Sequence, residues 1–216
     1  MKRFHDRAEA GRALADMLGH YANRRDVLVL ALPRGGVPVA FEIAKSLRLP
    51  LDVFVVRKLG VPGHEELAMG AIASGDVRVA NPAVIEALGI SDETLDAVTA
   101  RERWELERRE RAYRQDRAAP TVRDRIVIVV DDGIATGSTM LAAIAALSQL
   151  GAQRTVVATP TIAHDALELL RRRVDEVVAV LAPETFRGVG EWYLDFSQTS
   201  DEEVRDLLQQ AAYFNA

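Results

Sequence analysis

Short, almost continuous apolar runs alternate along the chain with stretches whose apolar residues recur every three or four positions. The runs are typical of strands buried on both faces of a parallel sheet, and the other stretches of amphipathic helices. The expected strands are residues 26–32, 51–56, 126–130, 153–159 and 175–181. The expected helices are residues 4–21, 37–47, 140–147, 165–173 and 201–214. This alternation predicts an α/β fold, a three-layer parallel sheet flanked by helices and joined by right-handed crossovers.

The middle of the chain departs from that alternation. Residues 68–73 and 77–80 are expected to form short strands, followed by a short helix over 82–88. A long charged helix over residues 91–117 begins at the capping residue Ser91 and ends before Pro120. We therefore predict a helical insertion at about 82–120. Its charges favour a solvated face with i, i+4 ion pairs over an anion-binding surface, and it would cover the site or mediate dimerisation.

Composition narrows the class of protein. A chain of 216 residues with 49% hydrophobic residues is expected to form a single domain, 1–216. The formal charge of −5 argues against a nucleic-acid partner, and no apolar run approaches the length of a membrane span. Cysteine is absent, and the first residues do not resemble a signal peptide. A soluble, cytoplasmic protein is expected.

The most distinctive stretch is residues 126–140, IVIVVDDGIATGSTM. Asp131 and Asp132 stand where a buried strand would end, and Gly133 and Gly137 permit a sharp turn after it. Thr136, Ser138 and Thr139 are N-cap candidates for the helix that follows. A helix start offers unpaired N–H groups and a positive dipole end, so the turn suits a phosphate. The two carboxylates suit the neighbouring hydroxyls of a ribose whose 5′-phosphate fills the turn.

Two other places carry candidate chemistry. Arg34, Gly35 and Gly36 follow the strand over 26–32 and precede a helix, which is a second loop with anion-binding geometry. Arg57 and Lys58 end the strand over 51–56, at the edge of the sheet where α/β proteins bind ligands. The Gly- and Pro-containing stretch 59–67 is expected to be a mobile loop. Two further sets of ionisable residues have no assigned chemical role. His5, Asp6 and Arg7 are taken as a solvated helix start, and a catalytic, metal-binding or solvated role stays open for His64, Glu65 and Glu66.

The stretch DDGIATGST closely resembles the ribose-phosphate motif of the type I phosphoribosyltransferases, which bind 5-phosphoribosyl 1-pyrophosphate (PRPP). The resemblance implies that Asp131 and Asp132 hold the ribose and that the turn holds the 5′-phosphate. It implies that Arg34, Gly35, Gly36 and Lys58 hold the pyrophosphate, with Arg57 beside them, and that the loop from Gly60 to Leu67 closes over it. Mg²⁺ would bridge substrate oxygens near the two aspartates. The PRPP-binding set is thus Arg34, Gly35, Gly36, Arg57, Lys58, Asp131, Asp132, Gly133, Ile134, Ala135, Thr136, Gly137, Ser138 and Thr139.

The tail is similar to a C-terminal stretch of the hypoxanthine-guanine phosphoribosyltransferases. PETFRGVGEWYLDF has an aromatic residue, Val-Gly, another aromatic, then Asp and a third aromatic. That resemblance implies a hood at about 183–198 in which Phe186 stacks on a base and Asp195 lies near its edge or a metal. Those enzymes carry a Lys shortly before the aromatic, where this chain has Val180, Leu181 and Ala182, which puts a 6-oxopurine in question. A purely structural hood core is the equal alternative.

Three functions follow from this reading. The first is transfer of the phosphoribosyl group from PRPP to a nitrogen heterocycle, with a purine-like base favoured, Mg²⁺ as cofactor, and Asp131, Asp132, Arg34 and Lys58 as catalytic residues. The second is a regulatory protein that binds PRPP or a nucleotide without turnover, and the third a hydrolase or phosphorylase of a phosphoribosyl metabolite. Dimers are common among the resembled enzymes, so a homodimer is one candidate assembly.

Overall fold

Five parallel strands form the central sheet of the computed structural model, which describes residues 3–115 and 117–213. Their order across the sheet is β2-β1-β6-β7-β8. The strands are β1 (Val27–Ala31), β2 (Leu51–Val53), β6 (Ile126–Val130), β7 (Arg154–Thr161) and β8 (Glu176–Leu181). Every residue of β1 and β6 is buried, as their unbroken apolar sequences predicted for strands covered on both faces.

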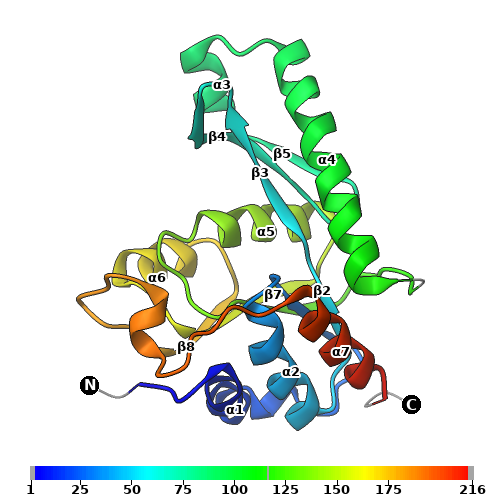
Figure 1. The fold of residues 1–216 in the computed structure, drawn as a ribbon, viewed down its shortest axis with the longest axis vertical. Coiled ribbons are helices and arrows are strands. Elements are labelled where there is room, and N and C mark those ends of the chain that lie inside the picture. Colours follow the sequence, from blue (N-terminus) through cyan, green and yellow to red (C-terminus); the bar gives the residue numbers. More distant parts are fainter. Residues whose placement is uncertain (1–2, 116, 214–216) are drawn as a thin grey trace.

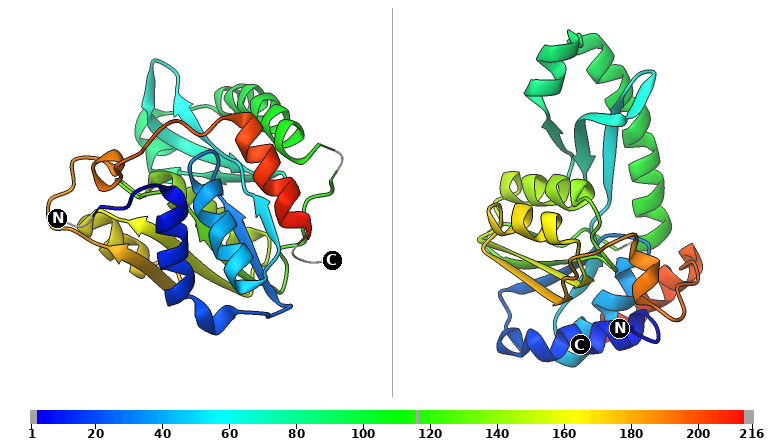
Figure 2. Two further views of the ribbon diagram at one scale, coloured as in Figure 1. Left: turned by 60° about the horizontal axis from the view of Figure 1, so that its bottom comes forward. Right: turned by 90° about the vertical axis from the view of Figure 1, so that its left-hand side faces the viewer.

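Helices cover both faces of this sheet (Figures 1 and 2). One face carries α1 (Arg7–Met17), α2 (Gly36–Leu47) and α7 (Asp201–Ala212), and the other carries α5 (Ser138–Gln149) and α6 (His164–Arg171). Two short 3₁₀ turns complete the body, η1 (Gly19–Tyr21) and η2 (Val189–Trp192). The three-layer α/β architecture predicted from the sequence is confirmed.

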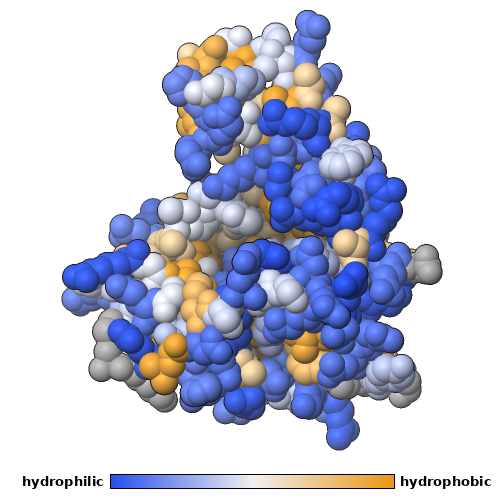
Figure 3. All heavy atoms as spheres, in the orientation of Figure 1, coloured by the Kyte–Doolittle hydropathy of each residue, from blue (hydrophilic) through white to orange (hydrophobic). Residues whose placement is uncertain are grey.

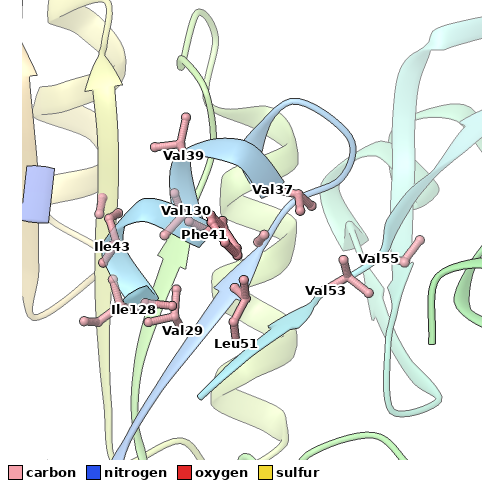
Figure 4. Packing of buried hydrophobic residues seen from close by; sticks show 14 of the residues in the cluster. Val29, Val37, Val39, Phe41, Ile43, Leu51, Val53, Val55, Ile128 and Val130 are labelled. Carbon is pink, nitrogen blue, oxygen red and sulfur yellow. The ribbon is translucent and has the colours of Figure 1, made fainter. Parts of the chain in front are cut away.

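The core between α2 and the sheet fixes the start of that helix relative to the strand ends. Phe41 and Ile43 of α2 face side chains of three neighbouring strands, including Val29, Leu51 and Ile128 (Figure 4). All of these side chains are buried, and burying one such side chain contributes roughly 1.5–3 kcal/mol. The N-terminus of α2 is therefore held rigidly over the end of β1.

An arm projects from the body (Figure 1). It contains a three-stranded antiparallel sheet of β3 (Val56–Val61), β4 (His64–Ala73) and β5 (Val77–Ala80). The helices α3 (Pro82–Leu88) and α4 (Asp92–Arg114) complete it, and Ser91 caps α4 as predicted, because its hydroxyl accepts from the Thr94 amide. Among the described residues, no helix is long and apolar enough to cross a bilayer.

Three expectations about element boundaries were wrong. The stretch 51–56 is not one strand, since β2 ends at Val53 and β3 begins in the second sheet at Val56. The stretch 59–67 is not a loop: β3 and β4 pair through it, and only residues 62–63 lie between the two strands. The helix expected over 4–21 is shorter, because Asp6 caps α1 by accepting from the Glu9 amide and η1 ends the stretch. The last residue of the helix expected over 201–214 lies outside the described residues.

Candidate functional site

The loops after β1 and β6 leave the sheet side by side. Ala31 pairs with Val130 in the parallel ladder, and the Leu32 amide donates to the Val130 carbonyl at 2.8 Å. The two loops then touch: a Cβ at Gly35 would lie 1.9 Å from Asp132 Oδ2, and one at Gly36 would lie 2.7 Å from the Val130 carbonyl oxygen. The register of the sheet thus brings the two predicted anion-binding loops together.

Asp131 and Asp132 are adjacent in the sequence, and we call them the acid pair. Their carboxyl groups have different surroundings. Burial, followed by the neighbouring Asp132 charge, raises the pKa of the Asp131 carboxyl well above its ordinary value. Asp131 Oδ1 accepts from the Asp132 amide at 2.9 Å. The Asp132 carboxylate accepts from Arg7 Nε at 2.8 Å, and the Asp132 carbonyl accepts from the Tyr193 hydroxyl at 2.5 Å. Asp132 is therefore braced from two directions, by α1 and by the C-terminal segment.

The turn before α5 is fixed to the core at Ile134, and the residues after Ile134 are mostly exposed to solvent. The Ile134 amide donates to the Thr161 carbonyl at 2.9 Å, and the buried Ile134 side chain packs into the core. Gly137, at φ 76°, is the N-cap of α5, and no side chain caps the helix. The N-cap role expected of Thr136, Ser138 or Thr139 was therefore wrong. Those three side chains and Ala135 are exposed at the helix N-terminus, where the Thr136 and Ser138 hydroxyls lie 3.1 Å apart and the Ser138 amide donates to Thr136 Oγ1 at 3.4 Å. Exposed hydroxyls at a helix N-terminus suit an anion.

Arg34 lies at the other side of the site, after a cis peptide bond between Pro33 and Arg34. Its guanidinium Nη1 is 3.7 Å from Asp201 Oδ1, which also accepts from the Tyr113 hydroxyl at 3.0 Å. Asp201 begins α7, and Tyr113 belongs to α4. Burial, followed by the hydrogen bond with Asp201, raises the pKa of Tyr113 to about 12. The predicted pyrophosphate loop is thus connected to both the C-terminal helix and the base of the arm.

Arg57 and Lys58 are neighbours in β3 with different surroundings. Arg57 donates to Glu102 Oε2 of α4, with Nη2 at 2.5 Å and Nε at 3.0 Å. Lys58 is exposed and lines a cleft of about 580 Å³ between the arm and α5, together with Ser138 at the start of α5. Lys58 therefore shares a cleft with the first residue of α5, whereas Arg57 is engaged within the arm.

The predicted hood closes over the turn from the C-terminal side. A Cβ at Gly133 would lie 2.3 Å from Val189 Cγ1, so η2 packs directly on the acid-containing loop. Phe186 is partly buried and stacks on Trp192, with ring centroids 6.3 Å apart. Asp195 is exposed, and its Oδ1 accepts from the Ser197 amide, which lowers the pKa of its carboxyl. The base-binding roles of Phe186 and Asp195 remain predictions.

Sequence reasoning missed two residues that contact the acid pair. Arg7 was taken as part of a solvated helix start, but its side chain is only 11% exposed and pairs with Asp132. Tyr193 was noted only as part of the hood motif, and its hydroxyl reaches the Asp132 backbone. A charged residue directly after the helix cap Asp6 gives no local signal of burial, because its partner is 125 positions away.

This arrangement has the donors and acceptors for a phosphorylated sugar. The open N-terminus of α5 suits a phosphate, the acid pair suits neighbouring hydroxyls, and Arg34 suits a second anionic group. Within residues 3–115 and 117–213, no three His, Cys, Asp or Glu side chains come together as a metal site. A divalent cation here would have to take its remaining ligands from water and a bound substrate.

Comparisons with known proteins agree with this geometry. The family model described as phosphoribosyl transferase domain matches residues 2–184. Two proteins of Mycobacterium tuberculosis, from strains CDC 1551 / Oshkosh and ATCC 25618 / H37Rv, are each 46% identical over 211 residues and each named "Putative phosphoribosyl transferase". The alignments cover 98% of this chain and 47% of each relative, so the chain spans about half the length of the curated relatives it matches.

Solved structures show the same fold. The crystal structure of TT1426 from Thermus thermophilus superposes with a TM-score of 0.86 at 42% identity, covering 96% of this chain and 98% of that one. AQ2163 from Aquifex aeolicus shares the fold at 11% identity, with a TM-score of 0.51 over 94% of this chain and 86% of that one. By its family match and its close relatives, this chain belongs to the phosphoribosyl transferase domain family.

Proposed function

We propose that the protein transfers the 5-phosphoribosyl group of PRPP to a nitrogen heterocycle and releases pyrophosphate. The observation that carries this proposal is the contact between the two loops. Gly35 lies so close to Asp132 that a methyl group there would overlap its carboxylate. A sugar held by the acid pair would therefore lie beside Arg34 and its backbone, where the pyrophosphate on C1 needs donors.

Each part of the site has a role in that reaction. Asp131 and Asp132 accept hydrogen bonds from the two ribose hydroxyls, while the exposed turn from Ala135 to Thr139 holds the 5′-phosphate. As the bond between C1 and the pyrophosphate oxygen breaks, positive charge develops on the sugar and negative charge on the leaving group. The acid pair stabilises the first, and Arg34 and Lys58 stabilise the second. A ring nitrogen of the acceptor then forms the new bond to C1.

The proposed cofactor is Mg²⁺. Mg²⁺ in phosphate sites is bound by one or two carboxylates, with substrate oxygens and water as the other ligands, and Asp131 and Asp132 fit that donor set. The raised pKa of the Asp131 carboxyl also fits, because a nearby cation would offset the unfavourable burial of its charge. When bound, the metal supplies charge neutralisation to the pyrophosphate group.

The proposed acceptor is a purine-like heterocycle that enters under the hood. The aromatic content of that segment supports it: Phe186 and Trp192 stack together, and Phe196 stacks on Tyr193 at 5.1 Å between centroids. Phe186 is proposed to contact the base and Asp195 its edge. The segment 180–182, directly before the hood, has no Lys, so the proposal stops at a purine-like ring and leaves its substituents open.

The first experiment is calorimetric titration with PRPP in the presence and absence of Mg²⁺, followed by screening of heterocycles for pyrophosphate release. We expect metal-dependent PRPP binding in the wild type and its loss in the variant Asp131→Asn, Asp132→Asn. Retained PRPP affinity in that double variant would contradict the ribose assignment. An absence of binding at millimolar PRPP would contradict the proposed function itself.

A regulatory protein that binds PRPP or a nucleotide without turnover is the second candidate. The observation that favours it is the hydrogen bond from Arg57 to Glu102, because an arginine paired within the arm is not available to bind PRPP during catalysis. The same screen separates the two functions. PRPP binding with no pyrophosphate release for any heterocycle would favour the regulator, whereas nucleotide formation would establish the transferase.

A further inference from the structure

Among the described residues, Arg7 is the one arginine with a hydrogen bond or ion pair to the acid pair, and its side chain is largely shielded from solvent. Its Nε donates to Asp132 Oδ2 at 2.8 Å, and its Nη1 donates to the Ser197 carbonyl at 2.7 Å. Its guanidinium carbon also lies 4.1 Å from the centroid of the Phe196 ring. One side chain therefore joins the acid pair in the core to the segment that follows η2.

The oxygen that Arg7 holds is also the one nearest Gly35. Asp132 Oδ2 is packed against the Gly35 backbone on one side and bonded to Arg7 on another. These two contacts favour one orientation of the carboxylate, and the Tyr193 hydroxyl donates to the backbone carbonyl of the same residue. A carboxylate that must accept from a ribose hydroxyl gains from such preorganisation, because no orientation has to be selected on binding.

The surroundings of Arg7 argue that it supports Asp132 rather than competing with the ligand. A competing cation would have to leave the carboxylate when substrate arrives. Arg7 is held by the Ser197 carbonyl and the Phe196 ring as well, so leaving Asp132 would require it to break three contacts. The cation–π contact with Phe196 adds to the two hydrogen bonds in holding the guanidinium in place.

We infer that Arg7 is a positioning residue for the ribose subsite, through which the Phe196–Ser197 segment sets the orientation of the Asp132 carboxylate. This inference rests on the proposed function and deepens it. It distinguishes two subsites: Arg7 would support the half of the site proposed to bind the sugar, and among the described residues none of its hydrogen bonds or ion pairs reaches the Arg34 loop proposed to bind pyrophosphate.

The test measures two probes on matched variants by calorimetry with Mg²⁺ present. Ribose 5-phosphate reports on the turn and the acid pair, and inorganic pyrophosphate reports on the Arg34 loop. The variants are Arg7→Gln, Arg7→Lys and Phe196→Leu. Arg12→Gln is the control, because Arg12 lies on the same helix, is 56% exposed and approaches Glu42 only at 3.8 Å. Thermal melting of each variant is recorded alongside.

We expect Arg7→Gln to weaken ribose 5-phosphate binding about tenfold, the scale of one lost charge-assisted hydrogen bond, and to leave pyrophosphate binding unchanged. Arg7→Lys should recover part of the loss, because Lys keeps the charge without the fork that reaches Ser197. Phe196→Leu should cause a smaller loss with the same selectivity, and Arg12→Gln none.

Three results would overturn the inference. Equal weakening of both probes would mean that Arg7 is merely structural. Unchanged ribose 5-phosphate affinity in Arg7→Gln would mean that Asp132 needs no support, and tighter binding would mean that Arg7 competes with the sugar. A wild-type protein that binds neither probe nor PRPP would instead remove the proposed function, and the positioning role with it.

Discussion

Gly35 and Gly36 are adjacent in the sequence, but a methyl group at each would meet a different kind of atom. At Gly35 the obstacle is the end of the Asp132 side chain, 1.9 Å from the added Cβ. At Gly36 it is the backbone carbonyl of Val130, at 2.7 Å, which is fixed by the sheet. A side chain is able to turn aside, whereas a central strand is not, so the two substitutions should have different consequences.

Gly35→Ala should therefore lower PRPP affinity, and Gly36→Ala should lower stability. In the first variant the Asp132 carboxylate is forced out of its position between Gly35 and Arg7, and we expect at least about a tenfold weaker affinity, or roughly 1.4 kcal/mol. In the second the start of α2 must move off the sheet, at a cost on the order of 1–3 kcal/mol. Calorimetry with PRPP and thermal unfolding separate the two effects.

Gly19→Ala is the matched control for both substitutions, because a Cβ there meets nothing within 4 Å. It should bind PRPP and unfold like the wild type. If Gly35→Ala bound PRPP normally, the close approach of the two loops would have no bearing on the donor site.

At the scale of elements, α4 is fastened to the body by a buried charge cluster. Arg114 Nε donates to Asp52 Oδ1 at 3.1 Å, its Nη1 to Glu110 Oε1 at 2.6 Å and its Nη2 to the Val53 carbonyl at 2.7 Å. Burial raises the pKa of Asp52 even though Arg114 acts in the opposite direction. The end of α4 is thus joined to β2 by a buried ion pair. Removing either partner would leave the charge of the other buried and uncompensated.

Arg114→Gln should therefore destabilise the protein by about 3–5 kcal/mol, the usual cost of removing one partner of a buried pair. Arg108→Gln is the control, since it breaks an exposed pair with Glu105 that contributes only about 0.2–0.5 kcal/mol. When the pKa of a carboxyl is higher in the folded protein than in the unfolded chain, the carboxyl favours folding at pH values below the unfolded-state pKa. That contribution to the free energy of unfolding is lost as pH rises through the folded-state pKa. The deficit of Arg114→Gln should therefore narrow as pH falls toward the ordinary Asp value of 3.8, as followed by urea unfolding. Equal deficits for the two variants would contradict the anchoring role.

The elements that sequence predicted well are those determined by local pattern. The strand over 126–130 and the helix over 82–88 occur as expected, because an unbroken β-branched run and an N-terminal proline are local signals. The division of 51–56 between two sheets was not predictable, because Val56 begins β3 and pairs with Ala73 of β4 in a hairpin whose sequence resembled a loop. The shielded side chain of Arg7 was not predicted for the same reason, since its partners lie in the acid loop and the C-terminal segment.

At the scale of the whole molecule, the arm stands apart from the body, and the surface is hollowed between them (Figure 3). The cleft there is lined on the body side by the outer face of α5, including Ser138 and Leu141, and on the arm side by Lys58 and Ala71. Arg57, one residue earlier, is bonded to α4 instead. Successive residues of a strand face opposite sides, so β3 presents one cation to the cleft and the other to the arm's own helix.

Replacing either Arg57 or Lys58 by Gln removes one positive charge from β3, but the effects on PRPP affinity and on stability should differ. Lys58→Gln should weaken PRPP binding about tenfold without changing the melting temperature, because an exposed lysine in the cleft that Ser138 also lines acts on the ligand alone. Arg57→Gln should lower the melting temperature and leave PRPP affinity intact, because Glu102, whose side chain is 13% exposed, would keep only its ion pair with the exposed Arg101. Calorimetry at two ionic strengths, with thermal melting, measures both effects, and the Lys58 effect should shrink at high salt. An equal loss of affinity in the two variants would mean that the arm acts through its overall charge, and the division of β3 into a ligand-facing and an arm-facing side would be wrong.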